Sequence, residues 1–106
     1  MRRVELSGEQ PVTAPGSVNA AVRRLATEAH VVVIEVAPGG VVGRHPAGAV
    51  QLFSVIRGSG WVSGGDGERA PIEAGEAVVW GAGEEHESGS DGGMTVLVVE
   101  GERLDV

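Results

Sequence analysis

The sequence predicts an all-β domain, and three observations carry that prediction. The chain has 19 Val against 5 Leu and 3 Ile, and β-branched side chains favour strands over helices. Its 18 Gly and 5 Pro require frequent turns. Short apolar runs alternate with turn-forming clusters about every 8–12 residues, which is typical of sandwiches and barrels. A chain of 106 residues is expected to form one such domain.

The N-terminal part of the chain is expected to differ from the rest. Gly8, Pro11, Pro15 and Gly16 interrupt any periodicity, so residues 1–19 are interpreted as an extended arm. Residues 20–106 are expected to form the β-barrel domain.

The segment 17–29, where arm and barrel meet, fits two interpretations. Val18, Val22 and Leu25 follow a helical spacing, but no C-cap residue follows and the next strand begins at once. We therefore interpret this segment as a strand.

The strands expected beyond residue 29 are separated by Gly-rich turns. The continuous apolar run from Val31 to Ile34 predicts a strand buried on both faces. A turn is expected at Gly58-Ser59-Gly60, and residues 64–67 (Gly-Gly-Asp-Gly) are a strong hairpin signal. The predicted strands are residues 30–36, 50–56, 61–63, 69–73, 77–80, 84–88 and 94–100.

Composition excludes several classes of function. The net charge of −7 argues against a nucleic-acid partner, which would select a basic face. No apolar run approaches the roughly 20 residues that span a bilayer, so a cytoplasmic protein is expected. The absence of Cys and Lys excludes thiolate metal sites and lysine Schiff bases. Arg without Lys, beside abundant Gly, Ala and Val, suggests a GC-rich bacterial source.

Two of the three histidines stand in spaced patterns. His30 opens a predicted strand between Ala29 and Val31 without polar neighbours, and we interpret it as a strand-end residue. His45 and His86 each follow a glycine at fixed spacing. The two patterns are G39-x5-His45-x-Ala47-x3-Gln51-x6-Gly58 and G75-x5-Gly81-x-Gly83-x2-His86-x3-Ser90.

These patterns resemble the two motifs of the cupin superfamily, G-x5-H-x-H-x3-E-x6-G and G-x5-P-x-G-x2-H-x3-N. The separation between Gly58 and Gly75 fits that of compact bacterial cupins. The resemblance implies an antiparallel double-stranded β-helix, also called a jelly-roll barrel. It further implies a small-molecule ligand or substrate and a homodimer, for which the N-terminal arm could supply contacts.

The departures from the motifs bear on function. Cupin metal sites carry three His and one Glu, whereas Ala47 occupies the second His position here and Gln51 the Glu position. The resemblance therefore implies an incomplete site of His45, Gln51 and His86, suited to divalent iron, zinc, nickel or manganese. A pocket without metal is the alternative. If the protein is an enzyme, dioxygenase, isomerase and cyclase chemistry all remain open.

The alternation of side chains along a strand, together with the resemblance, suggests which residues line a pocket beside that site. Gln51, Phe53 and Val55 share one face of a strand, which the resemblance places inward. The expected lining residues are Ala47, Phe53, Val55, Trp80 and Glu84. For Glu84 the competing interpretation is a solvated strand end, and for Phe53 and Trp80 it is simple filling of a small barrel.

Overall fold

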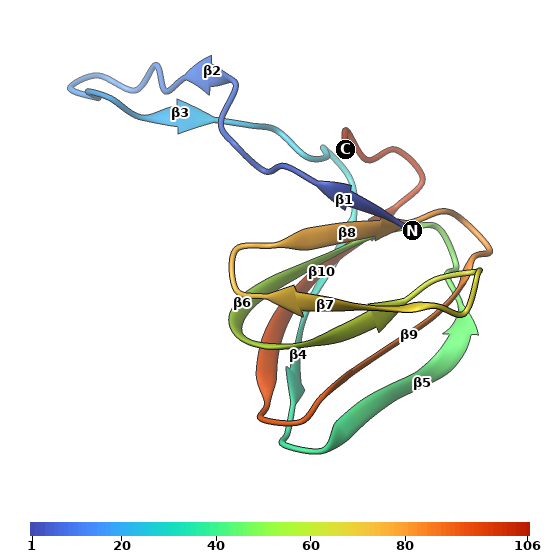
Figure 1. Ribbon diagram of the computed structural model, residues 1–106. Coiled ribbons are helices and arrows are strands. Elements are labelled where there is room, and N and C mark those ends of the chain that lie inside the picture. The colour runs from blue at the N-terminus through green and yellow to red at the C-terminus, as the bar shows by residue number, and fades with distance from the viewer.

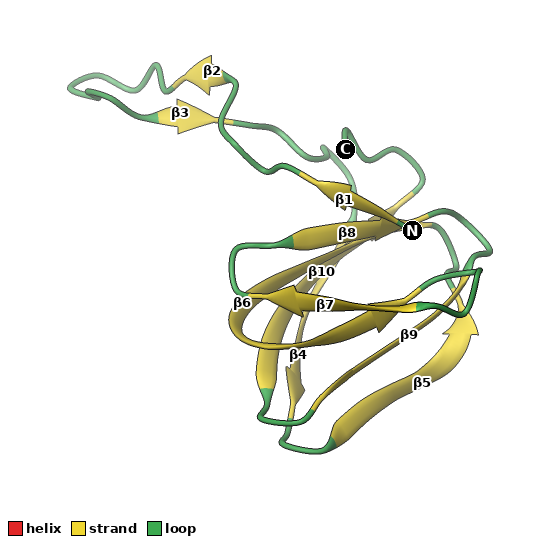
Figure 2. Ribbon diagram, in the orientation of Figure 1, coloured by secondary structure: helices red, strands yellow, loops and turns green.

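The computed structural model describes residues 1–106 and contains strands but no helix, which confirms the predicted fold class (Figure 2). No element is therefore a long apolar helix that could cross a bilayer. The strands are β1 (Arg2–Val4), β2 (Gln10–Pro11), β3 (Ala21–Val22), β4 (His30–Val36), β5 (Gly40–Pro46), β6 (Val50–Ser63), β7 (Arg69–Glu73), β8 (Ala77–Trp80), β9 (Glu85–Ser90) and β10 (Met94–Gly101).

Two antiparallel layers form the barrel and share strand β6 (Figure 1). In the large sheet the strand order is β1-β8-β6-β10-β4. In the small sheet β5 pairs with β9, β9 with the second half of β6, and β6 with β7. Because β6 passes from one layer to the other, its two halves tie both walls of the barrel together.

The continuity of β6 corrects the predicted turn at residues 58–60. Gly58 adopts a φ of +80°, a left-handed conformation that favours glycine. The pairing of β10 with β6 is also irregular between Thr95 and Val96, and such irregularities bend strands. The glycine therefore bends one long strand between the layers, where the sequence suggested that it ends one strand and begins another. The hairpin expected at residues 64–67 is confirmed, since β6 and β7 pair on either side of it.

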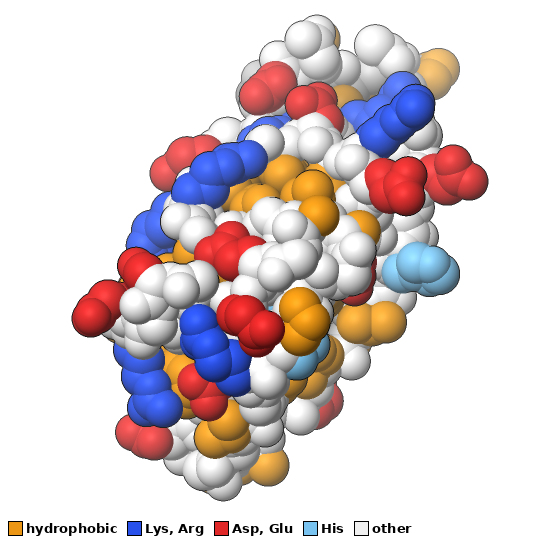
Figure 3. Space-filling view, turned by 90° about the vertical axis from the view of Figure 1, so that its right-hand side faces the viewer, with side chains coloured by type: hydrophobic (Ala, Val, Ile, Leu, Met, Phe, Trp, Pro, Cys, Tyr) orange, Lys and Arg blue, Asp and Glu red, His pale blue; other side chains and the backbone are white.

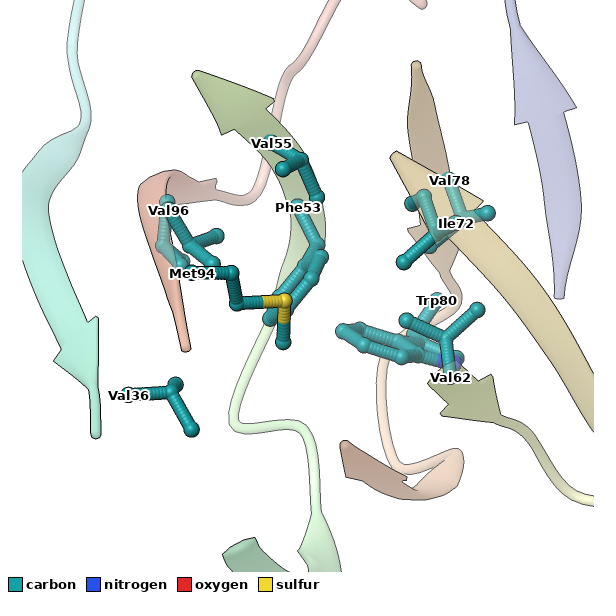
Figure 4. Close-up of a cluster of buried hydrophobic side chains, with 10 residues drawn as sticks. Val36, Phe53, Val55, Val62, Ile72, Val78, Trp80, Met94 and Val96 are labelled. Atoms are coloured by element: carbon teal, nitrogen blue, oxygen red, sulfur yellow. The ribbon is translucent and has the colours of Figure 1, made fainter. Parts of the chain in front are cut away.

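Inward-facing side chains of both layers fill the barrel interior (Figure 4). Trp80 and Val62 come from opposite layers and lie beside one another in Figure 4, and Phe53, on the strand next to that of Trp80, packs against the Trp80 ring. The Phe53 and Trp80 rings meet edge to face at 5.1 Å between centroids, a favourable arrangement for aromatic pairs. The whole cluster is Val36, Phe53, Val55, Val62, Ile72, Val78, Trp80, Met94, Val96 and Val98.

A second apolar layer covers part of the outer face of the large sheet. Leu52, Ala77, Val79 and Val99 are buried there beneath residues of the two chain ends, among them Leu6 and Leu104. The termini therefore act as a partial cover for this face.

That cover does not reach β4, so the prediction of a strand buried on both faces is wrong for residues 31–33. Val31, Val32 and Val33 are 59, 50 and 59 % exposed. The physical reason is that β4 is an edge strand of an antiparallel sheet, paired only with β10. A continuous apolar run indicates two buried faces when other layers cover both faces of the sheet, which is not the case at this edge.

The N-terminal segment is not uniformly extended. β1 pairs with β8 and belongs to the large sheet, whereas β2 and β3 form a separate hairpin that projects from the barrel in Figure 1. Within residues 17–29 only Ala21–Val22 is strand, so the longer strand expected there is wrong. Leu25 packs against the outer face of the large sheet, but Val18 and Val22 are exposed, so the segment has no continuous apolar face that would hold a longer strand against the barrel. The division of the chain between residues 19 and 20 stays a prediction.

Candidate functional site

The two motif histidines face one another across the small sheet. His45 lies on β5 and His86 on β9, and their Cα atoms are direct partners in the antiparallel ladder. The ring centroids are 4.3 Å apart, with 57° between the ring planes. The ladder is irregular between Val42 and His45, so the strand adjusts its register just before it presents His45.

Backbone carbonyls fix which nitrogen each imidazole leaves free. Nδ1 of His45 lies 2.6 Å from the Gly43 carbonyl oxygen, and Nδ1 of His86 lies 3.1 Å from that of Glu84. Because a carbonyl oxygen only accepts, each Nδ1 must carry the proton that it donates. In the neutral rings the Nε2 atoms then hold the lone pairs, which is the form that ligates metal ions.

The environment of His86 keeps that ring neutral. His86 is 3 % exposed and stacks on Trp80, with centroids 4.4 Å apart and 28° between the planes. Burial lowers the pKa of His86 below its ordinary value, and the nearby His45 acts in the same direction. The hydrogen bond to the Glu84 carbonyl and the charges of Glu84 and Glu100 oppose this shift without cancelling it. A neutral imidazole does not have to lose a proton to bind a cation.

Gln51 belongs to a row of residues that crosses the large sheet at the same end of the barrel. Its Cα partners are Trp80 on β8 and Glu100 on β10, and Glu100 is in turn the partner of His30 on β4. Gln51 Nε2 donates to Glu100 Oε2 at 3.3 Å. This row therefore joins Gln51 to Trp80, the side chain on which His86 stacks.

A hollow of about 850 Å³ opens beside this row. Its walls include His30, Glu100, Gly48 and Arg103. None of the five residues expected to line a pocket contributes to it.

Those five residues occupy other surroundings. Phe53, Val55 and Trp80 pack with one another in the barrel interior, and the Trp80 indole N–H is buried there without an acceptor. Ala47 is buried, and its backbone pairs with Gly83 and Glu84. Whether a ligand reaches these side chains stays a prediction.

Glu84 is held away from the histidines by other donors. Its Oε2 accepts from the Met1 ammonium at 2.7 Å and from the Gly65 amide at 2.9 Å, while Oε1 accepts from the Gly81 amide at 3.0 Å. Partial burial alone would raise the pKa of this carboxyl, but these hydrogen bonds outweigh it and lower the pKa to about 2. Glu84 thus contributes its backbone carbonyl to the site, and its carboxylate anchors the chain terminus.

The side chains gathered here provide only some of the ligands that a divalent ion with a preference for imidazole needs. No three His, Cys, Asp or Glu side chains gather closely enough to hold an ion by themselves. The nitrogen donors at hand are the two imidazoles whose Nδ1 atoms are engaged by carbonyls, and Gln51 lies on the neighbouring row, as the ladder partner of Trp80. Such a set suits zinc, nickel or iron in its nitrogen ligands, but it brings no negative charge of its own.

Two features of the site were not anticipated from the sequence. Glu100 was not singled out, although alternation places it on the same face as Val96 and Val98, both of which are inward. His30 lacks polar neighbours along the chain, yet its cross-strand partner is Glu100. Strand pairing, which the sequence does not state, creates both relationships.

Fold and site together define a small double-stranded β-helix with paired histidines at one end. A model of the cupin domain family matches residues 32–103, well over half of the chain. The chain therefore belongs to the cupin family.

Solved structures agree with that assignment. A predicted oxalate decarboxylase from Thermotoga maritima is 27 % identical, with a TM-score of 0.62 over 67 % of this chain and 64 % of that one. An RmlC-like cupin from Shewanella frigidimarina is 20 % identical, with a TM-score of 0.66 over 72 and 68 % of the two chains. The DMSP lyase DddQ from Ruegeria pomeroyi is 16 % identical, with a TM-score of 0.67 over 76 % of this chain and 42 % of that one.

These similarities establish the fold and leave the reaction open. The last two neighbours share too little sequence to indicate more than architecture, and the Thermotoga and Ruegeria proteins are named for different activities. The chain spans 64 % of the length of the Thermotoga protein. No curated protein matches the chain.

Proposed function

We propose that this cupin domain binds a divalent metal ion through His45 and His86, with the side-chain oxygen of Gln51 as a neutral third donor. The observation that carries the proposal is the cross-strand histidine pair whose Nδ1 atoms are both engaged by backbone carbonyls. The remaining coordination positions would be open to a small metabolite. When bound, an ion held by these residues would polarise a carbonyl or activate dioxygen, which accommodates dioxygenase, isomerase or cyclase chemistry.

The protein's own groups prepare the site in three ways. The carbonyls of Gly43 and Glu84 orient the rings. Trp80 excludes water from one face of His86, and burial keeps that imidazole neutral by lowering its pKa. Gln51 adds an oxygen without charge, so the affinity is expected to be lower than in a three-His-one-Glu site.

A titration of untagged protein with Zn²⁺ by isothermal calorimetry tests the proposal. We expect one site per chain in the wild type and no such site in His86→Ala or His45→Ala. His30→Ala is the matched control, because it removes the third histidine without touching the pair. Equal binding by wild type and His86→Ala would refute the proposal.

A metal-free binding module is the second candidate function, and the buried Trp80 indole N–H favours it. An unsatisfied buried donor costs about 1–3 kcal/mol, and a ligand with an acceptor atom in the barrel interior would remove that cost. Ala47 and Gln51, which weaken metal binding, support the same candidate. Absence of Zn²⁺ binding together with binding of a small metabolite by the wild type would favour it.

The domain is also proposed to act as a homodimer. Val31, Val32 and Val33 leave an apolar strand at the open edge of the large sheet, and such edges readily pair with another chain. The projecting β2–β3 hairpin has only two paired residues in each strand and needs a supporting surface, since isolated hairpins are marginal. A second copy would supply that surface.

Sedimentation at micromolar concentration distinguishes the dimer from a monomer. Val33→Lys is expected to yield monomers, because it places charge on the exposed edge. Val41→Lys, an equally exposed valine on β5, is expected to leave the dimer intact. A wild-type monomer at this concentration would rule out the dimer.

The charge distribution agrees with a small-molecule partner. On the face shown in Figure 3, arginine side chains alternate with acidic ones, and no basic field of the kind that binds phosphate backbones is visible.

A further inference from the structure

The hydrogen bond between Gln51 and Glu100 determines how the Gln51 amide is oriented. The Glu100 carboxylate has no proton to donate when ionised, so only the NH₂ end of the amide can face it. Nε2 therefore points to Glu100 Oε2, at 3.3 Å. The opposite end of the amide, Oε1, is directed away from Glu100. Oε1 is not among the buried polar atoms that lack a partner.

Glu100 is itself held in place. Its Oε1 accepts from the Ala49 amide at 3.1 Å, and it is the direct ladder partner of Gln51. The carboxylate lies close to Gly48, where an added Cβ would be 2.9 Å from Glu100 Oε1 and would make the carboxylate shift. The β5–β6 loop thus leaves a space that a carboxylate occupies, and the carboxylate in turn fixes Gln51.

We propose that Glu100 positions Gln51 as an oxygen donor of the histidine site and supplies the negative charge that position 51 lacks. This inference rests on the proposed function. Glu100 lies outside both sequence motifs, on the last strand of the barrel. It acts through Gln51 and is a positioning residue, in the way that carboxylates behind metal-bound histidines orient those rings.

The charge arrangement explains why a glutamine is compatible with cation binding here. The amide transmits part of the carboxylate's negative potential to Oε1, since a polarised hydrogen-bond chain strengthens its terminal acceptor. A glutamate at position 51 beside Glu100 would instead place two carboxylates within hydrogen-bond distance, and one of them would have to hold a proton. Gln51 and Glu100 together therefore carry a single negative charge.

Zn²⁺ titration of four proteins tests this relationship. Glu100→Gln removes the charge and frees the amide to flip, so binding is expected to weaken about 10–100-fold, the usual loss for such supporting partners. Glu102→Gln removes a carboxylate from the same hollow without touching Gln51, and its affinity should equal that of the wild type. The reversed pair Gln51→Glu with Glu100→Gln restores one charge and one amide, and it should bind at least as tightly as the wild type.

The outcomes separate this inference from the proposed function. If the wild type binds no Zn²⁺, the proposed function fails and this inference fails with it. If the wild type binds and His86→Ala does not, but Glu100→Gln binds like the wild type, only the role of Glu100 is refuted. A merely structural Glu100 would lower the unfolding midpoint of Glu100→Gln without changing its affinity, and the reversed pair would then show no recovery.

Discussion

His45 and His86 are direct partners in the β5–β9 ladder, but His45 is exposed and His86 is buried. His45 sits on β5, a strand that is mostly exposed, whereas His86 is buried on β9 against Trp80. Both rings are oriented by a carbonyl two residues earlier in the chain. The pair therefore combines one rigid, desolvated imidazole with one that solvent and ligand can reach, an arrangement suited to a site that exchanges its ligands.

The largest expected effect comes from removing the support of the buried histidine. Trp80→Ala should destabilise the fold by about 3–5 kcal/mol, the usual cost of deleting a large core aromatic. The pKa of His86 should rise toward its ordinary value, since the ring would become hydrated. Urea unfolding and an NMR titration of the histidines measure the two effects.

Trp61→Ala is the control for that experiment. Trp61 is only partly buried, with the Arg69 guanidinium 3.6 Å above its ring. Its loss should cost clearly less stability and leave the pKa of His86 unchanged. Equal costs for the two tryptophans would contradict the account of the barrel core.

The second prediction adds a third imidazole to the pair. Ala47→His with Gln51→Glu should tighten Zn²⁺ binding by an order of magnitude or more and make it more pH-dependent. Because Glu100 adjoins position 51, most of the gain should come from the histidine. Ala47 is buried, so overpacking is expected to cost about 1–3 kcal/mol. Calorimetry on the folded variant decides the matter, and unchanged affinity would mean that these positions do not converge.

The third prediction compares how much each motif histidine contributes to the stability of the fold. His45→Ala should change the free energy of unfolding by less than about 0.5 kcal/mol, as is usual for exposed sites, and His86→Ala by about 1–3 kcal/mol. Chemical denaturation of both variants measures the difference. If the costs were equal, the two environments would not differ as described.

The smallest effect concerns Glu84 and acid stability. The pKa of this carboxyl is lowered from its ordinary value of 4.5 to about 2, so the folded state binds this proton less readily than the unfolded state. The contribution to stability is present above about pH 4.5 and is lost as the pH falls toward 2. Glu84→Gln should therefore show a weaker loss of stability across that window. Identical acid transitions in both proteins would contradict the assignment.

The sequence predicted the fold class well because its signals are local. The excess of valine favours strands wherever it occurs along the chain. The turn at residues 64–67 and the strands 69–73 and 77–80 follow from residues close together in sequence, and the structure confirms all three. β5 was missed, since Gly40, Gly43 and Pro46 hide its strand character. The exposure of β4 depends on what flanks it, and no periodicity in the chain encodes that.

The same limit applies to the site. Glycine spacing pointed to His45 and His86 because the motif preserves distances along the chain. The partnership of Gln51 with Glu100 joins residues far apart in sequence through ladder register. The hydrogen bond from the Met1 ammonium to Glu84 is likewise a contact between residues far apart in sequence. Strand alternation alone therefore could not show whether Glu84 binds a metal ion or the N-terminus.

¹⁵N NMR of the histidine side chains during Zn²⁺ addition tests the cross-strand metal site most directly. We expect the Nε2 resonances of both His45 and His86 to shift together on binding. Their Nδ1 atoms should stay protonated, and His30 should remain unchanged. Shifts at Nδ1, at His45 alone or at none of the histidines would contradict a metal site formed by the cross-strand pair.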